Sequence, residues 1–412
     1  MQRWIPRFLI FLGLVVPPLG CSTTRPMLPS DPTKPIPLPL REGGDLPEIP
    51  LPQPPPPKPL DVKPVVAEAP PVAVRTKPLN ILCVSGGGAY GAYTSGVLNG
   101  WSRSNNRPTF DVVTGISTGA LIAPLAFLGP QYDPEMRMYY TEVRQRDVFS
   151  IRSWATIPFR DAVASSAPLR RMIDNAITED AIKEIAAEHR KGRRLYIGTT
   201  HLETRKTVVW DIGAIASKGG LDARKQILDV LVASCSVPGV FPPMPITMMV
   251  DGKPITEMHV DGGVTTSIFV PSAVFDAIAK EQKNGDLPGS KANLFAIVSG
   301  KYYPTQAPVK PKVIKLLKAS GGAILHAQLR RDLANLALTS KLSGATYHSL
   351  ALRQDFPIDD AALEFDQKVM NQLFVEGLKI GLEGPIWDSN PPERSGGDDE
   401  IRSGSRMLPT KP

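Results

Sequence analysis

The sequence has too little cysteine for a disulfide framework. It holds three cysteines in 412 residues, and no Cys-x-x-Cys or Cys/His cluster has the spacing of zinc ligands. The residues therefore give no reason to expect a structural metal. Cys83 and Cys235 both lie in apolar runs, so we expect them to be buried and inert, although they are also the two thiols that could pair with each other.

Basic stretches of the kind that bind nucleic acid are also lacking. Lys and Arg number 47 against 40 Asp and Glu, and the net charge of +7 is spread along the chain without a basic run that alternates with aromatic residues. We expect no nucleic-acid partner. The charge excess either attracts anionic lipid head groups and cell wall or keeps the protein soluble.

Apolar runs of membrane-spanning length are missing as well. A content of 42% hydrophobic and 21% charged residues is ordinary for a soluble domain and excludes a polytopic membrane protein. The apolar stretch from Phe8 to Val16 is too short to span a bilayer. Because it follows two arginines and precedes small residues, it has the parts of a secretory signal, and we predict a signal peptide over residues 1–20.

The junction Gly20-Cys21 directly after this signal resembles the cleavage box of bacterial lipoproteins, in which the cysteine is lipidated and becomes the N-terminus. This implies a lipid-modified Cys21 and attachment to a membrane of the bacterial cell envelope without a spanning segment. Ser22 beside the cysteine resembles the outer-membrane rather than the inner-membrane sorting pattern. Pro18 stands where that box has Leu, so ordinary secretion or an uncleaved anchor remains the alternative.

Proline is concentrated in one segment of the chain. Of the 43 prolines, 18 fall between Arg25 and Pro78. Such a run cannot continue a helix or donate the hydrogen bonds of a sheet, so residues 21–78 are predicted to hold the lipid-attachment cysteine and an extended polyproline spacer. Residues 388–412 are polar and lack apolar periodicity, and we expect a disordered tail there. One folded domain, residues 79–387, remains between them.

Short β-rich runs and helical stretches alternate through residues 79–387. Alternation of this kind predicts an α/β domain with a mostly parallel central sheet and helices on both faces. We expect strands over 79–84, 110–116, 194–200 and 293–299, a hairpin arm over 204–210, and helices over 89–102, 120–127, 168–190, 221–233 and 365–381.

One sharp strand-to-helix turn carries a serine. In Gly115-Ile116-Ser117-Thr118-Gly119, Gly115 and Gly119 permit the close backbone packing of a tight turn, and Ser117 stands at its tip. The hydroxyl is thereby exposed at the N-terminus of a helix, whose N–H groups favour a developing oxyanion. Ser117 is therefore the candidate nucleophile.

A second glycine-rich turn, Gly86 to Gly91, also follows a strand and opens a helix. Gly86, Gly88 and Gly91 formally satisfy the Gly-x-Gly-x-x-Gly pattern of dinucleotide-binding turns, and Asp111 lies at the distance of the ribose-binding acid. However, Asp111 begins the strand that leads into the serine turn rather than ending a second strand. We therefore favour the other use of three consecutive glycines, which is to bring backbone amides close to a reacting carbonyl oxygen.

A serine nucleophile needs a base. None of the five histidines lies at a glycine turn, whereas Asp261-Gly262-Gly263 places a carboxylate directly after a short strand. Asp251-Gly252, ten residues earlier, is interpreted as an ordinary turn. The alternative is a histidine-assisted hydrolase in which His326 or His348 completes the order Ser, Asp, His.

The three motifs in this order resemble the patatin-like phospholipase family, and the stretches Ala233 to Pro238 and Phe241-Pro242-Pro243 strengthen a resemblance that covers residues 79 to 275. It implies an α/β lipid acyl hydrolase with a Ser-Asp dyad and with neither metal nor cofactor. Tyr90 replaces the basic residue often found at its position in the family, which leaves the backbone donors intact. The roles implied are Ser117 as nucleophile, Asp261 as general base, and the amides of Gly87, Gly88 and Thr118 as oxyanion donors.

The resemblance also implies a lipid ester substrate and an apolar acyl pocket. Residues 147–168 could gate this pocket, with Phe149, Trp154 and Phe159 either touching lipid or belonging to the ordinary core. The alternative function is that of a membrane-tethered lipoprotein that binds lipid or envelope partners without turnover. A pure binding module has no physical need for a nucleophile at a strained turn, so we favour the enzyme.

Overall fold

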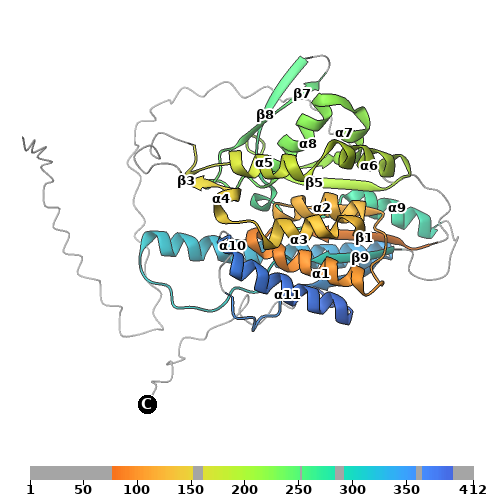
Figure 1. Ribbon diagram of the computed structural model, residues 1–412. Coiled ribbons are helices and arrows are strands. Elements are labelled where there is room, and N and C mark those ends of the chain that lie inside the picture. Colours follow the sequence, from red (N-terminus) through yellow and green to blue (C-terminus); the bar gives the residue numbers. More distant parts are fainter. Residues whose placement is uncertain (1–76, 152–160, 251–252, 284–291, 359–363, 393–412) are drawn as a thin grey trace, which may run out of the picture. The chain divides into compact units, whose positions relative to one another are not determined.

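The computed structural model describes residues 77–151, 161–250, 253–283, 292–358 and 364–392 (Figure 1). The expected signal peptide, Cys21 and nearly all of the proline-rich spacer lie outside the described residues. So do Trp154, Phe159, the Asp251-Gly252 turn and most of the expected tail. Within the described ranges, no helix is both long enough and apolar enough to cross a membrane.

An eight-stranded sheet runs through the described part of the chain in the order β10-β9-β1-β2-β5-β8-β7, with β6 also paired to β5. The first five strands in this order are parallel, and the pairings of β6, β7 and β8 are antiparallel. The expected mostly parallel α/β sheet is therefore confirmed. The strands are β1 (Leu79–Val84), β2 (Val112–Gly115), β5 (Arg194–His201), β6 (Lys206–Asp211), β7 (Met244–Val250), β8 (Lys253–Asp261), β9 (Ala292–Ile297) and β10 (Thr346–Leu350).

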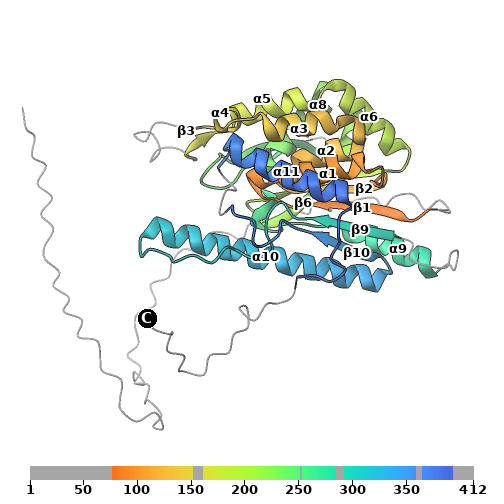
Figure 2. The same ribbon diagram turned by 60° about the horizontal axis from the view of Figure 1, so that its bottom comes forward.

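Helices cover both faces of this sheet, as Figure 2 shows. Alternate side chains of β1 point to opposite faces, because successive residues of a strand do so: Leu82 belongs to one buried cluster and Ile81 to the other. The first cluster includes side chains of α1 (Gly91–Arg103), α2 (Thr118–Leu128) and α11 (Gln367–Glu383). The second includes side chains of α9 (Ser272–Lys283) and α10 (Val313–Ser343).

The helices α1 and α11 pack against each other through glycines. A Cβ at Gly100 would lie 2.3 Å from the carbonyl oxygen of Leu378, and one at Gly381 would lie 2.3 Å from that of Val97. Neither position can hold a side chain without moving a backbone. The two helices can therefore approach at backbone contact.

The helical region expected over 168–190 is interrupted. It forms α5 (Ala167–Ala176) and α6 (Glu179–Arg190), because the side chain of Thr178 accepts the N–H of Ala181 and so begins a new helix. The remaining elements include α3 (Asp133–Thr141), α4 (Gln145–Val148), β3 (Ser150–Ile151), β4 (Ala164–Ser165), α7 (Ile212–Lys218), α8 (Gly220–Ser234) and the 3-10 turns η1 (Gly88–Tyr90), η2 (Pro130–Tyr132) and η4 (Gly262–Val264).

The expected start of the tail at residue 388 falls on a paired residue. Asp388 and Ser349 exchange two backbone hydrogen bonds of 2.9 Å, which adds a bridge beside β10. The side chain of Asp388 also contacts the hydroxyl of Tyr302 at 3.2 Å. Ordered structure therefore extends at least to Asp388.

Candidate active site

Ser117 lies at the tip of a strained turn between β2 and α2. Its backbone has φ 52° and ψ −121°, and a non-glycine residue with positive φ is uncommon and costs free energy. A Cβ at Gly115 would lie 2.3 Å from the carbonyl oxygen of Gly119, so the turn closes more tightly than side chains would permit. The strand-turn-helix context expected for the serine is present.

Two residues at the end of α8 hold the backbone of this turn. The N–H of Ser117 donates to the hydroxyl of Ser234 at 3.0 Å, and that hydroxyl donates to the carbonyl oxygen of Gly198 at 2.7 Å. The thiol of Cys235 donates to the carbonyl oxygen of Ser117 at 3.3 Å. These contacts satisfy both backbone groups of the serine in its unfavourable conformation.

Both cysteines within the described residues are free and buried, as expected. Burial raises the pKa of the Cys83 thiol to about 12. Burial, together with the negative charge of Asp261, raises the pKa of Cys235 well above its usual value. Cys235 therefore stays a neutral thiol beside the turn and acts as a weak donor.

The sheet brings Asp261 to the same place because β5 changes neighbours along its length. Its first half pairs with β2, ending with Gly115 opposite Ile197, and its last residues pair with β8, where Asp261 stands opposite Thr199. The two positions on β5 are two residues apart, roughly 7 Å along a strand. Asp261 thus arrives just beyond the point where β2 stops and the Ser117 turn begins.

Asp261 is buried, with 4% of its surface exposed. Its Oδ1 accepts the N–H of Gly263 at 2.7 Å. Its Oδ2 has no hydrogen bond of standard geometry among the described residues, although the Ser117 side chain lies near enough to lower the pKa of the carboxyl group. Burial raises the pKa of Asp261 to about 6, and the neighbouring Ser117 side chain and the N–H of Gly263 act in the opposite direction. Asp261 is therefore a stronger base than an ordinary aspartate and is still ionised at neutral pH.

The backbone amides around Ser117 divide into two groups. The N–H of Gly86 donates to Ser267 and the N–H of Gly119 to the carbonyl oxygen of Ile116. No hydrogen bond within the described residues uses the N–H of Gly87, Gly88 or Thr118. These three, the donors proposed from sequence, are available to a ligand.

Tyr140 of α3 holds Thr118, a contact that no sequence motif indicated. The Tyr140 hydroxyl donates to the carbonyl oxygen of Thr118 at 3.1 Å and also contacts the Thr118 hydroxyl. Because the tyrosine proton goes to the carbonyl, the Thr118 hydroxyl must donate to the tyrosine oxygen. Burial raises the pKa of Tyr140, which keeps it neutral. The first residue of α2 is thereby fixed in orientation.

An apolar pocket opens beside the serine. Gly88, Ser117 and Thr118 form part of its wall, and none of its lining residues carries a charge. The rest of the wall comes mainly from aliphatic and aromatic side chains of α2, α3, α5 and the end of α8. The lining includes Leu121, Leu125, Tyr139, Leu169, Met172, Ile173 and Leu231 from these helices, with Phe241 and Phe365 from the segments beside them.

Phe149, one of the aromatics considered from sequence, belongs to the packing behind this pocket. It is 9% exposed, and its ring packs edge-on against the pocket residues Phe241 and Phe365, with centroids 5.9 and 6.2 Å away. Phe149 therefore has the core role rather than direct exposure to lipid.

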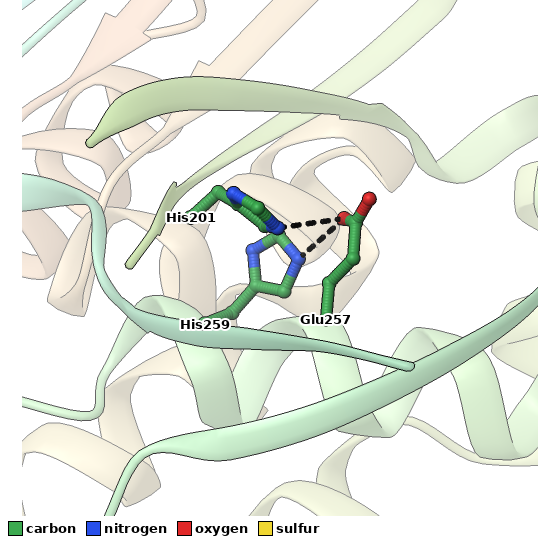
Figure 3. Close-up of side chains that lie close together, drawn as sticks. All are labelled: His201, Glu257 and His259. Atoms are coloured by element: carbon green, nitrogen blue, oxygen red, sulfur yellow. Dashed lines mark hydrogen bonds and ion pairs between the residues drawn. The ribbon is translucent and has the colours of Figure 1, made fainter. Parts of the chain in front are cut away.

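His201, Glu257 and His259 form the one group within the described residues that offers several metal ligands, with one ligand atom each within 4.8 Å of the others (Figure 3). Glu257 Oε2 lies 3.1 Å from Nε2 of His259 and 3.6 Å from Nε2 of His201. Two histidines and a glutamate are a common zinc ligand set. The hydrogen bonds around the rings decide whether their nitrogens are available to an ion.

These bonds place a proton on both Nε2 atoms. The backbone N–H of Thr204 donates to Nδ1 of His201 at 3.1 Å, so the neutral ring carries its proton on Nε2. Nε2 of His259 lies 3.1 Å from a carboxylate oxygen of Glu257, which can only accept, so the neutral ring carries its proton there and its Nδ1 accepts the Thr199 hydroxyl at 2.9 Å. In this arrangement both rings present N–H groups, rather than lone pairs, to the glutamate. The trio is therefore a polar network in which Glu257 is hydrogen-bonded to His259 and lies close to His201.

This network lies on the strand that carries the candidate base. Glu257, His259 and Asp261 are alternate residues of β8 and so share one face. His259 stands opposite His201 on β5, and burial lowers its pKa. The network therefore fixes the pairing of β8 with β5 just before Asp261.

The two histidines considered as alternative bases lie on other elements. His348 belongs to β10 and stacks on Phe295, with ring centroids 5.0 Å apart. Two strands, β9 and β1, separate β10 from β2, which corresponds to about 14 Å at the usual strand spacing. His326 lies in α10. The ring nitrogens of His201 and His259 contact Thr204, Thr199 and Glu257 rather than Ser117.

Comparison with known proteins relates the chain to one family. Residues 82–274, just under half of the chain, match the model of a family described as patatin-like phospholipase. The matched segment contains the glycine-rich turn, the serine turn and the Asp261 motif. No curated protein sequence matches the chain.

Solved structures give weaker similarities. VipD from Legionella pneumophila is 10% identical, with 74% of this chain and 66% of that chain covered and a TM-score of 0.35. The type III effector protein ExoU is 14% identical, with 74% and 52% covered and a TM-score of 0.24. ExoU in complex with SpcU from Pseudomonas aeruginosa is 14% identical, with 77% and 54% covered and a TM-score of 0.21. The chain spans less than two thirds of these chains, and TM-scores this low carry no conclusion.

Proposed function

We propose that the protein is a patatin-like serine hydrolase that cleaves carboxylic esters of lipids, as a phospholipase A, lysophospholipase or related esterase. One observation carries the proposal: Ser117 stands at a strained strand-to-helix turn in the wall of an uncharged apolar pocket, with the buried Asp261 beside it. The match of residues 82–274 to the patatin-like phospholipase family supports it.

In the proposed mechanism, Ser117 attacks the carbonyl carbon of the ester. Its hydroxyl proton passes to Asp261 Oδ2, the oxygen that the Gly263 N–H leaves unoccupied. The tetrahedral intermediate then expels the alcohol, which takes this proton from Asp261, and the acyl group remains on Ser117. A water molecule, deprotonated by Asp261, hydrolyses the acyl-enzyme and restores the serine.

The developing oxyanion would be stabilised by backbone amides. The N–H groups of Gly87, Gly88 and Thr118 have no partner within the described residues, and Thr118 opens α2. Donors aimed at the position where charge develops, in a site that excludes water, contribute several kcal/mol to such steps. In this proposal the backbone amides alone stabilise the oxyanion, and neither a metal ion nor a cofactor takes part.

The pocket favours an acyl chain over a charged head group. Its lining is uncharged, and a charged group would lose its hydration there without a partner. We therefore propose that the acyl chain occupies the pocket while the alcohol part of the lipid stays toward solvent.

We further propose that the domain acts at a membrane of the bacterial cell envelope, with the outer membrane favoured. The support is the Gly20-Cys21 junction after the signal-like segment. If Cys21 carries acyl chains, the Cys21→Ser variant should leave the membrane fraction, and mass spectrometry should detect the lipid on the mature N-terminus. An unmodified chain beginning at Met1 in the cytosol would contradict this part of the proposal.

The catalytic part is tested by measuring fatty acid release from phospholipid, lysophospholipid and neutral ester substrates. Ser117→Ala and Asp261→Asn should each lower the rate by about 10³-fold or more. The double variant should be little worse than either single one, because residues that act as a unit are not additive. Asp251→Asn is the matched control and should be near neutral.

Two results would replace this proposal. A loss on His326→Ala or His348→Ala as large as that of Ser117→Ala would indicate a histidine-assisted hydrolase. A folded wild-type protein that binds lipid vesicles but releases no fatty acid from any of the three substrate classes would indicate a binding lipoprotein without turnover.

A further inference from the structure

The helix α10 has two halves in different surroundings. In its C-terminal half, Leu329 and Leu333 are buried against the sheet. In its N-terminal half, residues 313–325, Val313 is 72% exposed and Leu317 68%. Figures 1 and 2 both show the first turns of α10 reaching past the ends of the sheet strands, on the side of β3 and α4. This half therefore presents apolar side chains with no protein surface against them among the described residues.

The exposed apolar side chains form a stripe. Val313, Leu317 and Ile324 are four and seven residues apart, the spacing that places side chains on one side of an α-helix. Ile324 is 64% exposed, and Leu316, beside the stripe, is 48% exposed. Apolar side chains gathered in this way mark an interaction surface rather than the scattered exposure of an ordinary helix.

Only positive charge accompanies the stripe. Lys310 precedes the helix, and at about 100° per residue Lys312 and Lys318 flank the stripe, about 120° to either side of its centre, while Lys315 lies on the opposite side of the helix. All four lysines are exposed, and the sequence has no Asp or Glu from residue 301 to residue 331. An apolar stripe flanked by lysines is the pattern of helices that lie in the surface of an anionic bilayer.

The other half of α10 is tied to the loop of the candidate base. The side-chain amide of Gln328 donates to the carbonyl oxygen of Gly263 at 3.0 Å. One turn later, Asp332 accepts the N–H of Ser267 at 2.7 Å and the hydroxyl of Thr266 at 3.1 Å. The exposed stripe thus begins about one turn from a residue bonded to the loop that follows Asp261.

We infer that the N-terminal half of α10 is a docking helix that lies in the surface of an anionic lipid bilayer, with the Val313, Leu317 and Ile324 stripe in the acyl boundary and the lysines at the phosphates. This inference rests on the proposed function, since a lipid ester hydrolase must meet its substrate in a bilayer. The Gln328 contact would hold the catalytic loop close to that surface.

A local fluorescence measurement tests the inference. Ser320 lies within the stripe and its neighbour Ala319 on the other side of the helix, and both are exposed. An environment-sensitive fluorophore is attached at Ser320→Cys or, as the matched control, at Ala319→Cys. The background is the full chain with Cys21→Ser, which removes the lipid anchor, and Ser117→Ala, which prevents hydrolysis of the vesicles. Cys83 and Cys235 are buried and should stay unlabelled.

Addition of phosphatidylcholine vesicles with about a third phosphatidylglycerol should shift the emission at position 320 to the blue and leave position 319 nearly unchanged. Pure phosphatidylcholine should give a weaker response. Lys312→Gln with Lys318→Gln should raise the lipid concentration at half-saturation about twenty-five-fold, since each lysine near an anionic surface contributes about a factor of five.

Two results would overturn the inference. The first is no response at position 320, or equal responses at both positions. The second is a blue shift that appears without vesicles and grows with protein concentration, which would make a second copy of the chain the occupant. The proposed function is judged separately, by hydrolysis of a soluble short-chain ester: Leu317→Ser with Ile324→Ser should keep that activity and lose activity on vesicles.

Discussion

The backbone N–H of Ser117 donates to the hydroxyl of Ser234 at 3.0 Å. The same hydroxyl donates to the carbonyl oxygen of Gly198 on β5 at 2.7 Å. One buried serine therefore links the strained turn, the end of α8 and the central sheet. The positive φ of Ser117 is maintained by this link and by the thiol of Cys235.

Removal of that hydroxyl should impair the site without touching the nucleophile. Ser234→Ala removes the acceptor of the Ser117 N–H and a donor to the Gly198 carbonyl oxygen, and an unpaired buried backbone group costs about 1–3 kcal/mol. We expect a loss of stability of this order and an activity at least tenfold lower, measured as kcat/KM on a soluble ester. Ser236→Ala is the matched control, because within the described residues the Ser236 hydroxyl bonds only to the carbonyl oxygen of Val232 in the last turn of α8, and it should stay near wild type. Equal effects of the two substitutions would contradict the link.

The rate should depend on pH through Asp261. The base must be ionised to accept the serine proton, and burial raises its pKa to about 6. We expect kcat/KM to increase tenfold per pH unit below 6 and to level off above about pH 7. An inflection near pH 4, the value of an ordinary aspartate, would show that Asp261 is not the group that limits the reaction.

The stability of Asp261→Asn should vary with pH in a defined direction. A carboxyl whose pKa is raised by folding stabilises the folded state below its unfolded value of about 4 and loses this contribution as the pH increases through about 6. Asparagine resembles the protonated acid at every pH. The variant should therefore match the wild type near pH 4 and be more stable at pH 7.5, by up to about 3 kcal/mol, in urea unfolding. A destabilised variant at pH 7.5 would contradict this.

The sequence indicates the local features of the site well. The tight turns at Ser117 and Gly86 to Gly91 depend on glycines whose spacing is visible in the chain, and most of the expected strands and helices are present. The alternation of strands and helices along the sequence was sufficient to predict the mostly parallel sheet. These features are local, so a single stretch of residues determines each of them.

Features that depend on distant residues were not predicted. Tyr140 and Thr118 are 22 residues apart, and Gln328 and Gly263 are 65 apart, so no pattern in one stretch indicates their contacts. The replacement of β2 by β8 beside β5 likewise follows from the register of three strands. The split between α5 and α6 was also missed, because the capping threonine, Thr178, occurs within a continuous helical pattern.

The glycines between α1 and α11 give a stability prediction. A methyl group at Gly381 would meet the carbonyl oxygen of Val97, so Gly381→Ala should lower the free energy of unfolding by about 1–3 kcal/mol. Gly322 in α10 has no atom within 4 Å of the position of a Cβ. Gly322→Ala should therefore stabilise the protein by up to about 1 kcal/mol through helix propensity. The two urea midpoints should move in opposite directions, and a shift in the same direction would contradict the close packing of these helices.

Covalent labelling with a fluorophosphonate probe, followed by mass spectrometry of the peptides, tests the assignment of Ser117 most directly. The probe reacts with a serine only where a base activates it and an oxyanion site receives the product. We expect one modified serine, Ser117, no labelling of Ser117→Ala, and strongly slowed labelling of Asp261→Asn. Labelling of a different serine, or of none in a folded protein, would contradict a nucleophilic Ser117 paired with Asp261.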